Sequence, residues 1–169
     1  MMYLKIVNES YKDQSSIRNL IDYVGRDKTY TDSNIHNTYT GGVNISDLNN
    51  AAEEFIIVKN YYGSTDGRQV RHMILSPDPK DLFTAPMLYE LALYVCAYYG
   101  NRYQVFFSVH TDKRTHLHVH FVMNTVSFVD GKKLHDTFKE QSEFRKYCED
   151  CYAQIKRKYL WAEKQTKFI

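Results

Sequence analysis

Four of the seven histidines in this chain lie close together in the sequence, at His110, His116, His118 and His120. Successive side chains of a β-strand point to opposite faces, so the last three imidazoles would share one face while the apolar residues between them turn toward a core. Neutral imidazole is the commonest metal ligand in proteins, and a set of three leaves coordination positions open for a substrate oxygen. The pattern therefore predicts a catalytic divalent-metal site. The alternative is a polar face on an exposed edge strand.

Two polar side chains near the histidines are candidates to support such a site. Asn124 has the same strand parity as His118 and His120, and Asp112 lies in the connection that follows His110. Either side chain could accept the free N–H of a ligating imidazole and so fix its tautomer. The alternative, left open by the sequence, is a turn aspartate and a solvated strand asparagine.

The histidines need two neighbouring strands to bring them together. Residues 103–110 and 117–128 are rich in Val and Phe, and the connection between them is too short for a crossover, so this pair should be antiparallel. His110 would then lie beside His118 and His120. Apolar periodicity and cap residues predict the other elements: strands at 3–8, 39–45 and 69–76, and helices at 15–25, 46–62, 84–100 and 140–161. We expect an α+β fold whose central antiparallel sheet carries the histidine motif and is covered by helices.

The composition suits one domain, which we expect to span residues 1–169, since 43% of the chain is hydrophobic. No segment approaches the ~18 consecutive apolar residues of a membrane helix, so no membrane insertion is expected. Three cysteines are too few for a secreted disulfide framework and favour a cytoplasmic location. The formal charge is only +2, so any site for a polyanion must come from local clustering of basic residues.

Several segments, in order along the chain, are similar to the motifs of a single protein family. They are residues 21–24 followed by 27–29, then 51–55, 67–76, 110–124, and 124–133 with His135. The histidine stretch 110–124 resembles the third motif of conjugative relaxases of the MobP type, which belong to the His-hydrophobe-His (HUH) endonuclease superfamily. The resemblance covers nearly the whole chain, from about residue 17 to residue 135.

This resemblance implies a bacterial DNA relaxase, a metal-dependent endonuclease that nicks one strand at the origin of transfer of a plasmid or mobile element and later rejoins it. It implies His110, His118 and His120 as ligands of a divalent metal, Mg²⁺ or Mn²⁺. Tyr23 would be the nucleophile that forms a 5′-phosphotyrosyl intermediate, and Asp112 would orient a ligand or help to take the tyrosine proton. The implied partners are single-stranded DNA at the origin and the accessory and coupling proteins of a relaxosome.

The position of Tyr23 in its predicted helix is compatible with this role. At ~100° per residue, Tyr23 lies about 110° from the centre of the apolar stripe of the 15–25 helix, so its hydroxyl need not be buried in the core and can face a groove. An ordinary tyrosine at the edge of a core is the alternative. Tyr30 and Tyr39, in or near a polar loop, are the other candidate nucleophiles.

Residues that would contact DNA or support the site are more weakly indicated. The candidates for DNA contact are the basic residues Arg68, Arg71, Lys132 and Lys133, and Ser76, which matches the second motif of the family. The candidates for supporting roles are His116, Asn124, His72 and His135. Each of these could equally be an ordinary surface residue.

Two other functions compete with the relaxase. One is an HUH replication initiator, but initiators usually place the tyrosine after the histidine pair, whereas Tyr23 precedes it. The other is a noncatalytic DNA-binding module whose metal only stiffens the sheet. Because relaxases commonly continue into a C-terminal region, we expect this chain to be a nuclease domain alone or a small relaxase.

Overall fold

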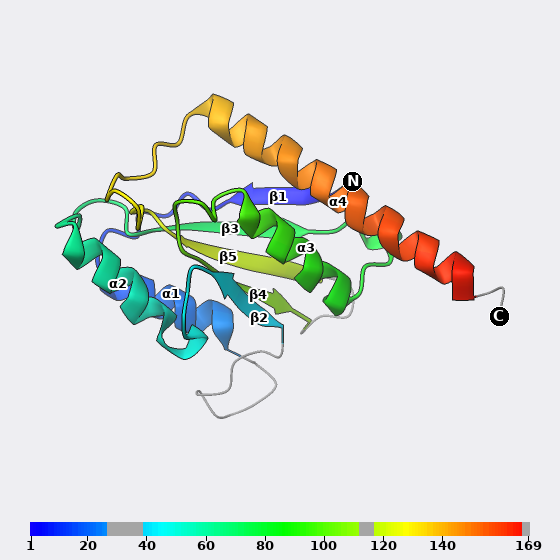
Figure 1. The fold of residues 1–169 in the computed structure, drawn as a ribbon, viewed down its shortest axis with the longest axis horizontal. Helices are drawn as coiled ribbons and strands as arrows, with labels where there is room; N and C mark the ends of the chain where they lie inside the picture. Colours follow the sequence, from blue (N-terminus) through cyan, green and yellow to red (C-terminus); the bar gives the residue numbers. More distant parts are fainter. Residues whose placement is uncertain (27–38, 112–116, 167–169) are drawn as a thin grey trace.

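An antiparallel sheet of five strands organises the fold, in the spatial order β1-β3-β5-β4-β2 (Figure 1). The strands are β1 (Tyr3–Ile6), β2 (Thr40–Val43), β3 (Val70–Ser76), β4 (Val105–His110) and β5 (His118–Asn124). The structure, a computed structural model, describes residues 1–26, 39–111 and 117–166, so Tyr30, Asp112 and His116 lie outside the described residues. The prediction that the two histidine-bearing strands are antiparallel neighbours is confirmed.

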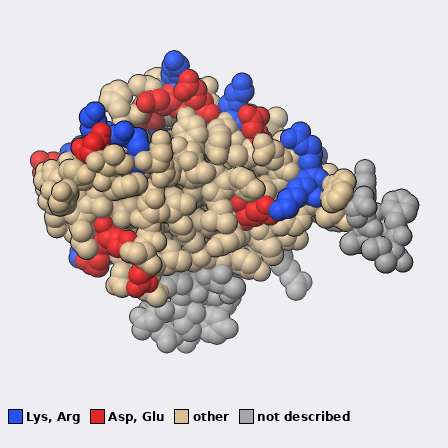
Figure 2. Space-filling model, in the orientation of Figure 1, with Lys and Arg blue, Asp and Glu red and all other residues tan. Residues whose placement is uncertain are grey.

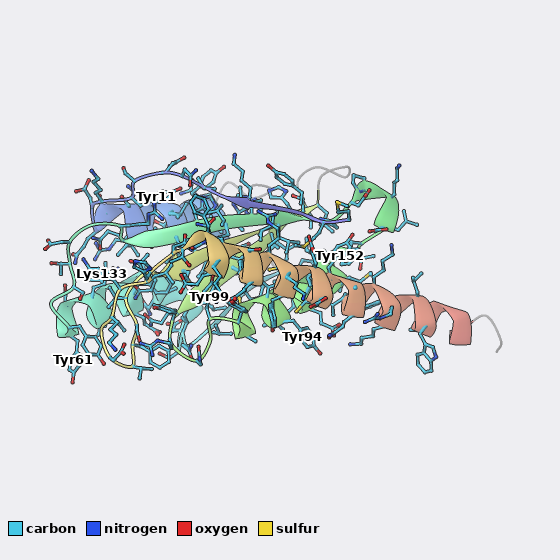
Figure 3. All side chains as sticks on the ribbon, turned by 90° about the horizontal axis from the view of Figure 1, so that it is seen from above. Tyr11, Tyr61, Tyr94, Tyr99, Lys133 and Tyr152 are labelled. Carbon is cyan, nitrogen blue, oxygen red and sulfur yellow. The ribbon has the colours of Figure 1, made fainter. Side chains whose placement is uncertain are left out.

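Helices cover both faces of this sheet, which confirms the predicted α+β class. They are α1 (Ser15–Gly25), α2 (Ala51–Tyr61), α3 (Ala85–Ala97) and α4 (Phe138–Thr166), with the 3₁₀ turns η1 (Leu48–Asn50) and η2 (Pro79–Asp81). α1 and α2 share one hydrophobic core with the sheet, and α3 and α4 share the other. Figure 3 shows α1 and α3 on opposite sides of the strands. Within the described ranges, every helix is too short or too polar to cross a bilayer.

The alternation of side chains along the central strands separates the two cores. Val119, Phe121 and Met123 of β5 point into the larger core beneath α3 and α4. Val122 points the other way, where with Phe106 it meets the apolar stripe of α1: Ile17, Leu20, Ile21 and Val24. Further along this second face the side chains become polar, with Ser108 and His110 on β4 and His120 and His118 on β5. The helix pair α1 and α2 therefore covers this face up to the histidines.

The start of α2 differs from the sequence prediction, which placed it near Ser46. The backbone N–H of Ser46 donates to the Glu54 carboxylate (2.9 Å), and so does the N–H of Asp47 (2.8 Å). Asp47 in turn accepts a hydrogen bond from the N–H of Asn49 (3.0 Å) and caps η1. Because these bonds hold the segment in a turn, α2 itself begins only at Ala51.

Asp81, in η2, ties the end of β3 to α4 and allows a test of the fold. Its carboxylate accepts hydrogen bonds from Lys156 and from the Tyr152 hydroxyl (2.5 Å), and these partners lower the pKa of Asp81 to about 2. Because this value is below the ordinary aspartate pKa of about 3.9, the stabilisation is present at neutral pH and is lost as the pH falls from about 4 toward 2.

We expect Asp81→Asn to lower the free energy of unfolding by about 1–3 kcal/mol near neutral pH. The gap between the two proteins should shrink on acidification, because the wild-type carboxylate becomes protonated as well. Urea denaturation at a series of pH values measures both quantities. A gap that stayed constant into the acid range would contradict this account of Asp81.

The outer surface over α3 carries few charged side chains. Figure 2 shows this face with Lys, Arg, Asp and Glu gathered mainly toward its rim. Leu93 and Tyr94 of α3 are exposed, and Glu90 is held in an ion pair with Lys158 (2.5 Å). A polyanion would meet little positive charge here, so a DNA site is expected on the other face of the sheet.

Candidate active site

Three histidines converge at the edge of the area that α1 and α2 cover. The register of β4 and β5 places His110 opposite His118, and His120 opposite Ser108. One ligand atom from each of His110, His118 and His120 lies within 4.8 Å of those of the other two. His110 and His120 are buried and His118 is half-buried. The structure thus brings together the three residues predicted as metal ligands, which we call the histidine triad.

The hydrogen bond of His110 already selects the tautomer that a metal needs. Its Nε2 lies 2.7 Å from the backbone carbonyl oxygen of Val24 in α1. A carbonyl can only accept, so Nε2 carries the proton and Nδ1 keeps its lone pair for a metal. This bond also fixes the end of α1 against β4.

The donor set of the triad fits a divalent metal ion. Within the described residues the cluster consists of imidazoles alone, without a carboxylate. Mg²⁺ prefers oxygen ligands, whereas first-row transition metals bind imidazole readily. Three imidazoles on one sheet face also leave room for oxygen ligands from a substrate. The chemistry of the site therefore fits a catalytic ion of the transition series better than it fits Mg²⁺.

Tyr23 lies beside the triad. Its side chain is 53% exposed, and its ring is edge-on to the ring of His120, with the two centroids 6.3 Å apart. The neighbouring residue Val24 is the one whose carbonyl accepts from His110. By contrast, Tyr39 packs against Tyr89 of α3, with ring centroids 6.3 Å apart, in the core on the other face. The described residues therefore favour Tyr23 over Tyr39 as a nucleophile.

His72 and Tyr11 extend the histidine cluster in the direction of β1. His72 Nε2 lies 2.8 Å from His120 Nδ1, and His72 Nδ1 lies 3.1 Å from the Tyr11 hydroxyl. Burial lowers the pKa of His72 to about 4, so this imidazole is neutral near pH 7. Burial and the neighbouring Glu9 carboxylate raise the pKa of Tyr11 to about 12, so its phenol is protonated. A supporting role for His72 is predicted from the sequence, whereas no motif in the sequence points to Tyr11.

A groove of about 840 Å³ leads from the surface to Tyr23 and His120. One wall is β1 and the segment that follows it, and the other wall is the face of α1 from Ser16 to Tyr23. The polar side chains on its walls include Lys5, Lys12, Ser16 and Asn19. Lys5 could not be predicted as a site residue, because a lysine in an N-terminal strand carries no signal of its own and only the sheet order places it near the triad.

Two predicted site residues have structural roles instead. Asn124 is fully buried, and its Nδ2 donates to the Phe55 carbonyl (3.2 Å) and to Gln104 Oε1 (2.9 Å). It therefore links α2 to the sheet, and its hydrogen bonds go to none of the histidines that the structure describes. Arg71 is 1% exposed on the opposite face from the triad and forms an ion pair with Asp136. Adjacent residues of a strand point to opposite faces, so Arg71 and His72 could not both serve one site.

The other predicted DNA contacts lie at the two ends of the sheet. Val70 pairs with Asn124 and Val126 bridges to Lys133, so Arg68 and the segment 132–135 lie at the end of the sheet away from His118. All of these side chains are exposed: Arg68, Lys132, Lys133 and His135. Lys133 donates to the Asp66 carbonyl (2.7 Å), and Lys132 is 3.6 Å from Asp130. Ser76 alone among the predicted DNA contacts shares the face and the end of the sheet with the triad.

An antiparallel sheet that carries a histidine triad beside an exposed tyrosine is the arrangement expected of an HUH endonuclease. The family of MobA/VirD2-like relaxases, through its nuclease domain, matches residues 23–159 of this chain. The match covers most of the sequence, begins at Tyr23 and includes the whole triad. The chain therefore belongs to this relaxase family. A comparison with curated proteins gives no match.

Proposed function

We propose that this protein nicks one strand of DNA at an origin of transfer on a plasmid or other mobile element. The phenol oxygen of Tyr23 attacks the scissile phosphate, a bond from that oxygen to phosphorus forms, and the bond from phosphorus to the 3′ oxygen breaks. The products are a 5′-phosphotyrosine and a free 3′-OH. The observation that carries the proposal is the exposed ring of Tyr23, edge-on to His120 of the triad.

The covalent intermediate makes the reaction reversible. The phosphotyrosyl bond retains the energy of the original phosphodiester, so an incoming 3′-OH restores the strand, whereas hydrolysis by water would not. The phenol loses its proton as its oxygen attacks phosphorus, and the departing 3′ oxygen takes up a proton to become the 3′-OH. Asp112, two residues after His110 in the sequence, is our proposed acceptor for that proton.

His110, His118 and His120 would hold the ion, and Mn²⁺ suits these imidazoles better than Mg²⁺. A bound divalent cation supplies positive charge that stabilises the nonbridging oxygens of the phosphate in the transition state. The chain itself positions the nucleophile: the hydrogen bond from His110 to Val24 anchors α1 next to Tyr23, so ligand and nucleophile are held in one frame. Such fixed positioning is where much of the rate of a phosphoryl transfer comes from.

The groove beside α1 offers the DNA strand a path to the triad. Lys5 of β1 pairs with Ile74 of β3, which pairs with His120 of β5, so Lys5 and His120 lie in one row across the sheet. Neighbouring strands are about 4.8 Å apart, which brings the Lys5 ammonium within reach of a phosphate next to the scissile one. Ser76 at the near end of the sheet, and Arg68, Lys132 and Lys133 at the far end, would contact the flanks of the DNA.

Lys5→Ala should weaken binding of a single-stranded oligonucleotide about 3- to 10-fold. It should also reduce by about one the slope of the logarithm of the binding constant against the logarithm of the salt concentration. The reason is the loss of one phosphate contact in the groove. Fluorescence anisotropy at several salt concentrations measures both effects. Lys139→Ala is the matched control, because Lys139 lies on α4, on the other side of the sheet, and is also exposed. Equal losses of DNA affinity in the two variants would show that Lys5 makes no specific contact with the DNA.

The proposed function is tested by looking for the covalent intermediate. The protein is incubated with Mn²⁺ and single-stranded oligonucleotides that tile candidate origins of transfer, and the products are separated under denaturing conditions. We expect a protein–DNA adduct together with a shorter oligonucleotide that ends in a 3′-OH. Tight binding with no adduct on any tile would instead support a noncatalytic DNA-binding module.

A further inference from the structure

The hydrogen bonds around His120 form a chain whose direction matters for metal binding. His120 Nδ1 lies 2.8 Å from His72 Nε2, and His72 Nδ1 lies 3.1 Å from the Tyr11 hydroxyl. A neutral imidazole has one N–H and one lone pair, so each ring in the chain can donate on one side only. The chain can therefore run in either of two directions.

One direction excludes His120 as a ligand. If the Tyr11 hydroxyl donates to His72 Nδ1, then His72 Nε2 carries the proton and donates to His120 Nδ1. His120 must then carry its own proton on Nε2, and neither of its nitrogens has a lone pair to offer a metal. In the reverse direction, His120 Nδ1–H donates to His72 Nε2, and the lone pair that a metal needs is on His120 Nε2.

We propose that Tyr11 and His72 are positioning residues that hold His120 in its metal-binding tautomer, with the Tyr11 oxygen accepting from His72 Nδ1–H. This inference rests on the proposed function only in assigning a metal to the triad. The Tyr11 hydroxyl proton is then directed away from His72 toward Glu9, which lines the same groove and whose negative charge helps to raise the pKa of Tyr11. Because a carboxylate can only accept, Glu9 gives the chain its direction, as the Val24 carbonyl does for His110.

The backbone conformation of Tyr11 indicates that the surrounding residues hold this side chain in place. Tyr11 has φ 38°, in the left-handed region that residues other than glycine seldom occupy. Gln69 holds it there: its N–H donates to the Tyr11 carbonyl (2.8 Å) and its Nε2 donates to the next carbonyl, of Lys12 (3.3 Å). Figure 3 shows Tyr11 on the α1 side of the strands. A strained backbone conformation of this kind persists only where the surrounding contacts enforce it, and such residues cluster at functional sites.

The test measures Mn²⁺ affinity by calorimetry on the full chain without DNA. We expect Tyr11→Phe and His72→Leu each to weaken binding about 10-fold or more, the usual effect of losing the partner of a metal-ligating histidine. His72→Gln should recover much of the affinity, because its amide oxygen can accept from His120 Nδ1–H. Tyr3→Phe, at an exposed tyrosine of β1, is the control and should bind Mn²⁺ like the wild type.

A second readout needs no metal. In the metal-free wild type, nitrogen-15 NMR should report the Nδ1–H tautomer for His120, and Tyr11→Phe should shift it toward the Nε2–H tautomer. The inference is overturned if His120 is Nε2–H in the folded wild type, or if Tyr11→Phe and His72→Leu bind Mn²⁺ as tightly as the wild type. A wild type that binds Mn²⁺ with the expected tautomer but forms no DNA adduct would count against the proposed nicking and leave the role of Tyr11 and His72 standing.

Discussion

Tyr23→Phe is expected to abolish both strand cleavage and the covalent protein–DNA adduct, a loss of at least about 10³-fold in the rate of nicking. The substitution removes only the phenol oxygen, which is the atom that bonds to phosphorus. The ring remains, so its edge-on contact with His120 should persist. The measurement is the yield of adduct and of nicked oligonucleotide after incubation with Mn²⁺, separated under denaturing conditions.

The same variant should keep its affinity for single-stranded DNA, because Tyr23 is one exposed residue at the end of the groove. Retained binding with lost cleavage would separate a chemical role from a structural one. Tyr30→Phe and Tyr39→Phe are the matched controls and should still form the adduct. If the adduct persisted in Tyr23→Phe and vanished in Tyr30→Phe, the nucleophile would be Tyr30, and the assignment of Tyr23 would fail.

Much of the fold follows from periodicity in the sequence. The stripe of apolar residues in α1 and the Val and Phe content of β4 and β5 depend on local spacing, and each predicted element is present. The strand order β1-β3-β5-β4-β2 could not be predicted in this way. It depends on which edges meet after long connections, and only tertiary packing decides that.

The residues of the candidate site likewise fall into those that local sequence predicts and those that depend on tertiary packing. The triad was predictable, because its three residues lie on two strands joined by a short connection. Lys5 was not, because its row with His120 exists only once β3 lies between β1 and β5. Asn124 has the same parity as His120, but α2 covers it through the Phe55 carbonyl. Parity assigns a face, whereas the helices decide which part of that face stays open.

Removing one ligand should have an effect second only to the loss of the nucleophile. His118→Ala is the best choice, because His118 is the half-buried member of the triad and its loss should disturb the core least. We expect Mn²⁺ affinity and nicking to fall by at least about 10²-fold each, since even the outer partners of metal ligands are worth 10- to 100-fold. Calorimetry and the nicking assay measure the two effects.

Thermal unfolding distinguishes this loss from misfolding, because an ion that binds only the native state raises the melting temperature. The wild type should melt at a higher temperature with Mn²⁺ than with a chelator, and chelation should stop nicking until Mn²⁺ is restored. His118→Ala should melt near the metal-free wild type whether or not Mn²⁺ is present. His135→Ala, which removes an exposed histidine at the far end of the sheet, should respond to Mn²⁺ as the wild type does. His118→Ala removes one of the three proposed ligands. A full Mn²⁺ response in this variant would therefore mean that the ion binds elsewhere in the protein.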